Sequence, residues 1–417
     1  MKGSGKIYIT IKFFRIMTDI QFGICGDLDW HNTSAEDNPL VTLKKEGVKE
    51  LIYELNREPK EEEELFSEYK ELEEEIEKLL RLGTLKEREG KVYVNFTFLD
   101  EKDNELMFDV CEDYVEYLVE KIISKEETIA TALSRYENDR VEKEKLAFFI
   151  IGCYFLDWGS LTFFREWDIA NNLKPQPGGN EYVLWGEKQD EGMLKEIYWG
   201  GHMIPDMDYI FQTFGDHHSD TKRDTLPDIL HRFHDFDFPG GEEYRSLLFQ
   251  KRKDLASELA EIISLVGKDG INAEELEESI GNPSSKKHIS LLEKLHYLEE
   301  EEGTYYLSIP YFTEEDVDII SDCIEPFVPV LKNWLDDNWE GLKEDLKETM
   351  PMKNGVPFDE FFIQAWHYVF GSVNKKLAKK GFIYDTYLEG SKHKGYLPGV
   401  GEKEVLDSLE DMVTELS

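Results

Sequence analysis

The strongest constraint on the fold is a pattern of residues that occurs twice in the chain. The segment CYFLDWGSL (153–161) is matched by AWHYVFGSV (365–373), and its Gly-Ser pair recurs 212 positions later. Cys111 and Cys323 have the same spacing. Two further matches keep the same order, LLRLGTLKEREGKVYV with LLEKLHYLEEEEGTYYL and Gly186-Glu187-Lys188 with Gly401-Glu402-Lys403. Such a repeat predicts an internal duplication in which each copy is a structural unit.

Both copies begin with the same order of predicted elements. In the second copy, the apolar spacing predicts a helix over 251–266. Asn272 then precedes a short second helix, and Pro283 opens a third. A hairpin follows, with its turn at Gly303, and the hairpin of the first copy turns at Gly90. Three helices and a hairpin are therefore expected in each copy.

This order resembles the winged helix-turn-helix domains of ArsR-like and MarR-like regulators. The resemblance is carried by IEKLLRLGTLKEREGKVYV (76–94) and ISLLEKLHYLEEEEGTYYL (289–307), in which a long third helix runs into a hairpin. It covers about 60 residues in each copy and leaves most of the chain unexplained. The resemblance implies a winged-helix fold, in which the third helix is the element that reads DNA.

We therefore predict an α+β, mostly helical fold, built as a tandem duplication of a winged helix-turn-helix followed by a helical module. A first strand is expected from Lys6 to Phe14, and either Met1 or Met17 is the start. The predicted parts are an N-terminal strand or extension at 1–40, winged-helix copy 1 at 41–100, helical module copy 1 at 101–199, a His/Asp-rich insert at 200–245, winged-helix copy 2 at 246–312 and helical module copy 2 at 313–417.

The charge balance limits the classes of partner. Against 48 Lys and Arg there are 89 Asp and Glu, which gives a net charge of −41. A field of that sign repels phosphate backbones and anionic lipid, so a uniformly cationic nucleic-acid coat is excluded. A salt-rich cytoplasm would screen the self-repulsion, and a halophilic source is one explanation of the acidic excess. No run approaches 18 apolar residues and the four cysteines are far apart, so we expect a cytoplasmic protein with reduced thiols and no membrane partner.

Residues suited to contact DNA are found in the second copy rather than the first. In copy 1, the stretch from Ser67 to Lys78 carries six Glu against two Lys, which phosphates would repel. In copy 2, polar and cationic residues gather at the start of the third helix, namely Ser284, Ser285, Lys286, Lys287 and His288. The wing of copy 2 opposes DNA, because Glu299 to Glu302 place four carboxylates at its tip.

A second cationic group lies near the end of copy 2. It consists of Lys375, Lys376, Lys379, Lys380, Lys392 and Lys394. Tyr384, Tyr387 and Tyr396 are interleaved with these lysines, which is the mixture expected of a surface that follows a nucleic-acid backbone and stacks on bases. The alternative is a solubilising lysine face on an amphipathic helix.

The predicted insert is rich in residues that bind metal ions. Its candidate ligands are His202, Asp206, His217, His218, His231 and His234. Imidazole with carboxylate is the ligand mixture of zinc, manganese or iron, and a metal-bound water can act as a nucleophile. No HExxH or HxH motif is present, however, and histidines in a polar loop are the alternative interpretation.

The hypothesis that follows is a non-enzymatic regulator or adaptor with two winged-helix modules, which together act as a pseudo-dimer in one chain. It would bind DNA through copy 2 or dock a protein partner. The rival hypothesis is a metal-binding protein or metal-dependent hydrolase that uses residues 202–237, with the metal ion as its cofactor. A third is an acidic mimic that occupies a nucleic-acid-binding partner.

Overall fold

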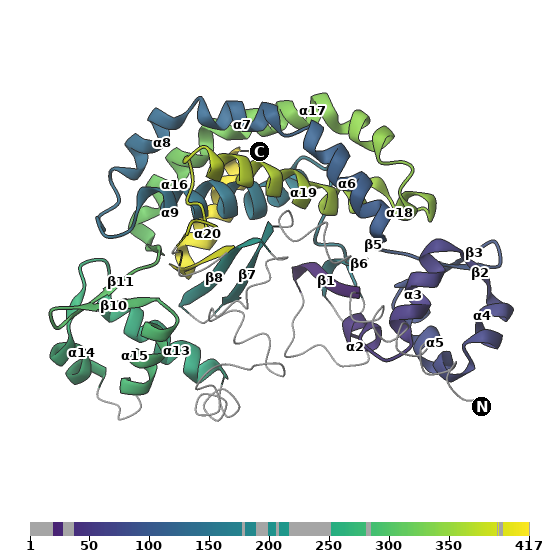
Figure 1. Ribbon diagram of the computed structural model, residues 1–417, viewed down its shortest axis with the longest axis horizontal. Coiled ribbons are helices and arrows are strands. Elements are labelled where there is room, and N and C mark those ends of the chain that lie inside the picture. Colours follow the sequence, from purple (N-terminus) through teal and green to yellow (C-terminus); the bar gives the residue numbers. More distant parts are fainter. Residues whose placement is uncertain are drawn as a thin grey trace, which may run out of the picture. The chain divides into compact units, whose positions relative to one another are not determined.

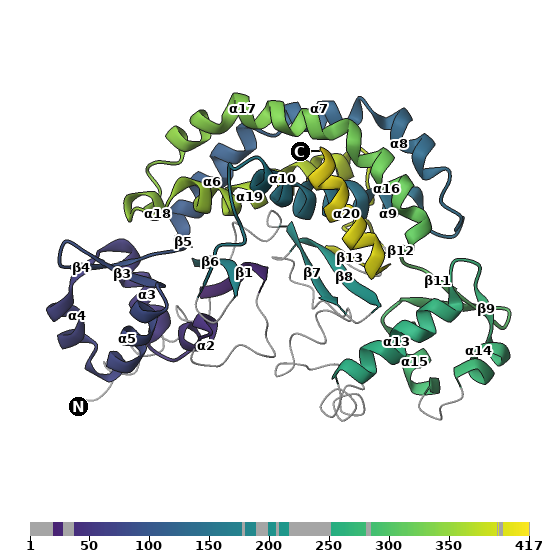
Figure 2. The ribbon, with the colours of Figure 1, turned by 180° about the vertical axis from the view of Figure 1, so that it is seen from behind.

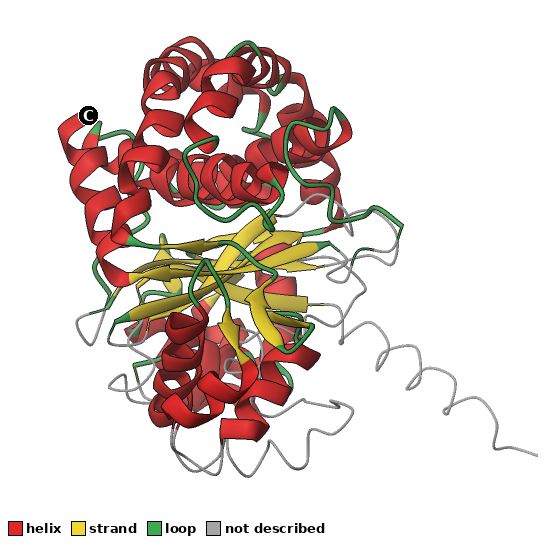
Figure 3. Ribbon diagram, turned by 90° about the vertical axis from the view of Figure 1, so that its left-hand side faces the viewer, coloured by secondary structure: helices red, strands yellow, loops and turns green. Residues whose placement is uncertain are grey.

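The structure is a computed structural model that describes residues 20–27, 37–176, 180–188, 199–205, 208–216, 252–280, 285–389, 391 and 395–416. Helix makes up 59% and strand 18% of it, which confirms an α+β, mostly helical protein (Figure 3). The strand expected at 6–14 lies outside the described residues. Two compact units are present: unit 1 is formed by 1–114, 164–194 and 336–369, and unit 2 by 115–163, 195–335 and 370–417.

Unit 1 contains a small module of helices and a hairpin (Figure 1). Its helices are α2 (Pro39–Leu43), α3 (Val48–Arg57), α4 (Glu62–Glu68), the 3-10 helix η2 (Lys70–Leu72) and α5 (Glu73–Arg81). Its strands are β2 (Lys60–Glu61), β3 (Leu85–Arg88) and β4 (Lys91–Val94), in the order β2-β4-β3. The buried apolar residues of α3, Val48, Leu51, Ile52 and Leu55, recur at helical spacing and pack into one apolar core with α5.

Unit 2 contains a comparable module of three helices and a hairpin. Its helices are α13 (Arg252–Val266), α14 (Ala273–Ile280) and α15 (Ser285–Lys294). Its strands are β9 (Ile271–Asn272), β10 (Leu298–Glu301) and β11 (Thr304–Leu307), in the order β10-β11-β9. Both hairpins turn on two residues with positive φ, Glu89 and Gly90 in unit 1 and Glu302 and Gly303 in unit 2. Glycine at the second position favours this tight turn, because it adopts positive φ without steric cost.

Each unit also has a larger sheet whose middle strand pairs in the same two ways. In unit 1, β6 (Glu181–Lys188) pairs antiparallel with β1 (Ile20–Asp27) and parallel with β5 (Thr97–Leu99). In unit 2, β13 (Tyr396–Glu402) pairs antiparallel with β8 (Tyr209–Asp216) and parallel with β12 (Tyr311–Phe312). Strand β7 (Trp199–Pro205) is added beyond β8 (Figure 2). The stretch 200–245, predicted as an insert, therefore contributes two strands to the sheet of unit 2.

The remaining helices divide between the units. Unit 1 holds α6 (Glu101–Asp113) and α18 (Met350–Lys353). Unit 2 holds α7 (Glu116–Ile123), α8 (Glu126–Leu133), α9 (Lys143–Ala147), the π-helix η3 (Phe148–Gly159), the 3-10 helices η5 (Glu314–Asp316) and η6 (Glu325–Phe327), α16 (Val317–Ile324) and α20 (Lys403–Leu416). The unit boundary falls inside α10 (Ser160–Glu166), α17 (Val328–Asp345) and α19 (Phe358–Lys379).

One helical stretch of the described chain, Lys143–Glu166, is long and apolar enough to cross a membrane, with a mean hydropathy of 1.5. Of its most apolar window, 89% is buried inside the protein. It consists of α9, η3 and α10, and every residue of η3 except Trp158 is buried. Burial of this kind identifies it as a core helix, because the apolar side chains are already covered by protein.

Candidate functional site

The two lysines at the start of α15 are exposed, as contact with DNA would require. The Lys286 ammonium lies 2.8 Å from the Glu277 carboxylate of α14. Ser285 begins the helix, and Ser284 lies outside the described residues. This surface therefore offers two exposed cations, and the Glu277 carboxylate lies beside Lys286.

His288 does not belong to this surface, which corrects the sequence-based assignment. Its side chain is buried, with a relative exposure of 2%. The imidazole Nδ1 lies 3.0 Å from the Glu258 carboxylate of α13. Burial lowers the pKa of His288 and outweighs the opposing effect of Glu258, so the neutral ring is favoured. His288 packs inside the module and cannot reach a phosphate.

The acidic wing of unit 2 contacts another segment of the same unit. The Glu301 carboxylate lies 2.8 Å from the Arg140 guanidinium. The same guanidinium stands 3.5 Å from the centre of the Tyr306 ring, a cation–π contact. Glu300 and Glu302 remain exposed. One arginine thus pairs with the wing tip, and the exposed carboxylates keep the tip acidic. An acidic tip would repel the phosphates of DNA, as expected from the sequence.

Helix α5, which corresponds to the predicted third helix of copy 1, has an acidic outer face. Ile76 and Leu79 are fully buried, whereas Glu73, Glu74 and Glu77 are exposed. The neighbouring α4 and its margins add exposed carboxylates, which are Glu61, Glu62, Glu63, Glu64 and Glu68. Amphipathic spacing places the apolar residues in the core, so the carboxylates of α5 face solvent.

The structure brings only part of the second lysine group to the surface. Lys379 and Lys380 are exposed at the end of α19, and Lys375 is half-buried. The Lys376 ammonium lies 2.6 Å from the Glu116 carboxylate of α7. Lys392 and Lys394 lie outside the described residues.

The tyrosines interleaved with these lysines do not form a stacking surface together. Tyr396 is 3% exposed, within strand β13. The Lys145 ammonium stands 5.1 Å from the centre of the Tyr384 ring. Tyr387 alone is exposed, at 36%. The patch is therefore smaller and less aromatic than the sequence suggests.

The predicted metal ligands fall largely outside the described residues. These are Asp206, His217, His218, His231 and His234, whereas His202 lies on β7. Within the described ranges, no group of three or more His, Cys, Asp or Glu side chains is placed to hold a metal ion. The metal hypothesis stays a prediction.

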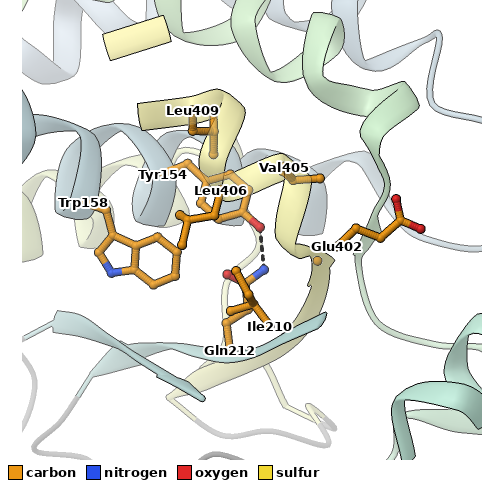
Figure 4. Close-up of a pocket in the computed structure, with 9 residues that line it drawn as sticks. Tyr154, Trp158, Ile210, Gln212, Glu402, Val405, Leu406 and Leu409 are labelled. Carbon is orange, nitrogen blue, oxygen red and sulfur yellow. Dashed lines mark hydrogen bonds between the residues drawn. The ribbon is translucent and has the colours of Figure 1, made fainter. Parts of the chain in front are cut away.

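A buried polar site in unit 2 was not foreseen from the sequence. A small pocket is lined by Tyr154 and Trp158 of η3, by Ile210 and Gln212 of β8, and by Val405 and Leu409 of α20 (Figure 4). The Gln212 amide nitrogen donates to the Tyr154 hydroxyl over 2.5 Å. Burial raises the pKa of Tyr154 well above its usual value, so the hydroxyl keeps its proton.

A buried carboxylate lies one helical turn away on the same π-helix. Asp157 is 3% exposed, and its Oδ2 accepts a hydrogen bond from the Gly201 backbone N–H over 2.8 Å. Burial raises the pKa of Asp157 to about 7, although that hydrogen bond acts in the opposite direction. Tyr154 and Asp157 are three positions apart, and no sequence motif marks them. Buried ionisable groups of this kind are common at functional sites.

No model of a known protein family matches the chain, and no curated protein or solved structure matches it either.

Proposed function

We propose that the chain is a non-enzymatic, cytoplasmic adaptor with two fused winged-helix modules, which docks a basic protein surface on the third helix of copy 1. Two copies in one chain would take the place of a homodimer, with one copy diverged in charge. The fold class and the buried core helix support a soluble protein. The third helix of copy 1, α5, is the docking surface because carboxylates dominate its exposed face, with Arg81 as an exposed cation in its last turn.

The duplication is part of this proposal, and details of the two sheets support it. Strands β1 and β8 both end in Gly-Asp, and Gly26 and Gly215 both have positive φ, 124° and 148°. Each of these glycines is paired with a tyrosine of the middle strand. In both units, the helix after the short parallel strand begins with a capping box. Asp103 completes it at α6 in unit 1, and Asp316 completes it at η5 in unit 2. Such agreement is expected of two copies of one ancestral unit.

The observation that carries the docking surface is the exposure of Glu73, Glu74 and Glu77 on one helix. Within the described part of the chain, none of the three has an ion pair. Clustered carboxylates attract a basic partner over several ångströms and speed its association. The start of α15 in copy 2, by comparison, exposes Lys286 and Lys287, and the Lys286 ammonium lies 2.8 Å from the Glu277 carboxylate of α14.

Charge reversal at this helix tests the proposal. In Glu73→Lys/Glu74→Lys/Glu77→Lys, we expect the affinity for poly-L-lysine of defined length to fall about tenfold or more in low salt. The matched control reverses three exposed glutamates of α7 and α8, Glu120, Glu126 and Glu127, and changes the net charge equally. The control should lose no more than about threefold. Equal losses in the two variants would show that net charge, and not this helix, determines binding, and the proposal would be wrong.

A DNA titration separates this proposal from the DNA-binding hypothesis, which the exposure of Lys286 and Lys287 favours. We expect no binding of duplex DNA at about 50 mM salt, because two exposed lysines offer few phosphate contacts and the Glu277 carboxylate lies beside one of them. Fluorescence anisotropy with labelled duplex measures this. Binding that falls steeply with salt and is lost in Lys286→Glu/Lys287→Glu would instead support a DNA-associated regulator.

A further inference from the structure

A buried carboxylate ties the π-helix η3 to the edge strand β7 of the sheet in unit 2. The Asp157 Oδ2 accepts a hydrogen bond from the Gly201 backbone N–H over 2.8 Å. Strand β7, which carries Gly201, is the last strand in the order β12-β13-β8-β7. Because the Gly201 amide donates to a side chain, the backbone polar groups at this position point away from β8. Asp157 therefore occupies the outer edge of β7.

The close approach of the helix to this strand depends on glycine at position 201. A Cβ built on Gly201 would lie 2.9 Å from the Trp158 Nε1, so the indole leaves no room for a larger residue. Trp158 follows Asp157 on η3, and two successive side chains of the π-helix thus lie beside one residue of β7. The contact between η3 and β7 is therefore built around the hydrogen bond of Asp157.

The second copy has an apolar residue at the position that matches Asp157. The spacing of 212 residues pairs Asp157 with Val369, which is fully buried in unit 1. Packing of this core position is thus possible with an apolar side chain and does not itself require a carboxylate. In unit 1, β1 matches β8 and is the outermost strand of the described sheet. Within the described residues, the carboxylate therefore occurs together with the additional strand β7.

The surroundings of Asp157 oppose its ionisation. Burial raises the pKa of Asp157 to about 7, although the hydrogen bond from Gly201 acts in the opposite direction. No charged side chain of the described residues contributes to this pKa shift. Cys153, four positions earlier on η3, stays neutral because burial raises its pKa well above the usual value. The side chain of His202, the next residue of β7, lies outside the described residues. The carboxyl group is therefore neutral in acid and becomes charged near neutral pH.

We propose that Asp157 and Gly201 form a pH-sensitive latch, which holds the edge strand β7 against η3 in acid and releases it toward neutral pH. When β7 moves away, water reaches the carboxylate and solvates its charge. Deprotonation therefore favours the released state, and protonation favours the closed state. Between pH 4 and pH 7 the ratio of released to closed molecules rises by up to about tenfold per pH unit. The latch does not depend on the docking surface of copy 1.

Backbone hydrogen exchange on the full chain tests the latch, because the protection of the Gly201 amide reports how often its hydrogen bond opens. After correction for the intrinsic exchange rate, this protection should fall about tenfold or more from pH 5 to pH 7. At pH 7 it should also be lower than the protection of the amides between β8 and β13, since β7 opens without unfolding of the unit. Mass spectrometry of peptides that cover 199–205 and 209–216 follows both strands.

Two substitutions separate the charge of Asp157 from its hydrogen bond. In Asp157→Asn the side-chain carbonyl still accepts from Gly201, and protection should stay constant within about twofold from pH 5 to pH 7. In Asp157→Val the acceptor is lost, so protection should be low at every pH. The matched control is Asp103→Asn, which removes a carboxyl group of unit 1 whose pKa burial also raises to about 7. In this control the pH dependence at Gly201 should remain.

Three results would overturn the proposal. The first is protection of Gly201 that does not change with pH in the wild type, and the second is a pH dependence that persists in both Asp157 variants. The third is protection of Gly201 equal to that of the amides between β8 and β13 at every pH, because β7 would then open only when the whole unit unfolds.

Discussion

Replacing Gly215 by alanine is expected to destabilise unit 2 by about 3 to 5 kcal/mol or to prevent its folding. Gly215 has φ of +148°, and a Cβ at this position would lie 2.3 Å from the Gly395 carbonyl oxygen and 2.5 Å from the Tyr396 Cα. Both are backbone atoms, at the first residue of the paired strand β13 and the residue before it, so no side-chain rotation relieves the overlap. Urea denaturation followed by circular dichroism measures the loss.

A second glycine separates the steric clash from the backbone strain. Gly303 also has positive φ, +81°, but nothing lies within 4 Å of a Cβ built there. Gly303→Ala should therefore cost only the left-handed strain of about 1 to 2 kcal/mol. If Gly215→Ala costs no more than Gly303→Ala, the close approach of the two strands is not as described. In unit 1, Gly26 has the same two restrictions, and Gly26→Ala should behave like Gly215→Ala.

Replacing Asp157 by asparagine is expected to change how stability depends on pH. The pKa of Asp157 is about 7 in the folded protein and near its usual value of 3.8 when unfolded. Between these values the folded state binds the proton more tightly, so the wild type loses stability as pH rises from 4 to 7. The full effect is about 4 kcal/mol. Relative to the wild type, Asp157→Asn should therefore gain about that much between pH 4 and pH 8.

The comparison isolates Asp157 because the other buried groups are present in both proteins. Burial raises the pKa of Asp103 to about 7, which acts in the same direction, and lowers that of His367 to about 4, which makes stability fall as pH falls. These contributions cancel when the two pH profiles are subtracted. Chemical denaturation at pH 4, 5.5, 7 and 8 provides the profiles. A constant difference across this range would mean that Asp157 stays charged in the folded protein.

Local elements were predictable because short-range rules decide them. The turns at Gly90 and Gly303 lie where the sequence places them, and both use positive φ at glycine. Helix α15 begins at Ser285, just after Pro283, as its start signal predicts. The spacing of apolar residues also predicted the helices of each small module, since three or four buried positions recur on one face.

The burial of His288 could also have been predicted from the sequence. His288 precedes Leu291, Leu292 and Leu295 by three, four and seven positions, which is the spacing of one buried helix face. Its neighbours Lys286 and Lys287 suggested a charged surface, but helical periodicity places them on another face. The periodicity is the better guide here, because a residue's face is fixed by its position on the helix and not by its neighbours in sequence.

The polar pocket could not be derived from local patterns. Tyr154 and Gln212 are 58 positions apart and meet only after β8 has paired with β13. The strand YIFQTFGD carries no sign that its glutamine points inward. The similarity of β8 to β1 was detectable, since both end in Gly-Asp before the chain turns away, but it becomes clear only when their pairing is known. Long-range pairing decides both features.

Each unit is built from three separate stretches of chain, so neither unit can finish folding until its last stretch has been synthesised. Unit 1 needs residues 336–369 in addition to 1–114 and 164–194, so the ribosome must add 175 residues after Leu194 before unit 1 is complete. At ordinary elongation rates this takes roughly 10 to 35 seconds. During that interval the apolar faces of α6 and α10 lack their final cover, which makes the nascent chain a client for chaperones. A fragment that ends between Leu194 and Asp336 should not reach the native state of unit 1, and mixing it with the rest of the chain should restore both units together.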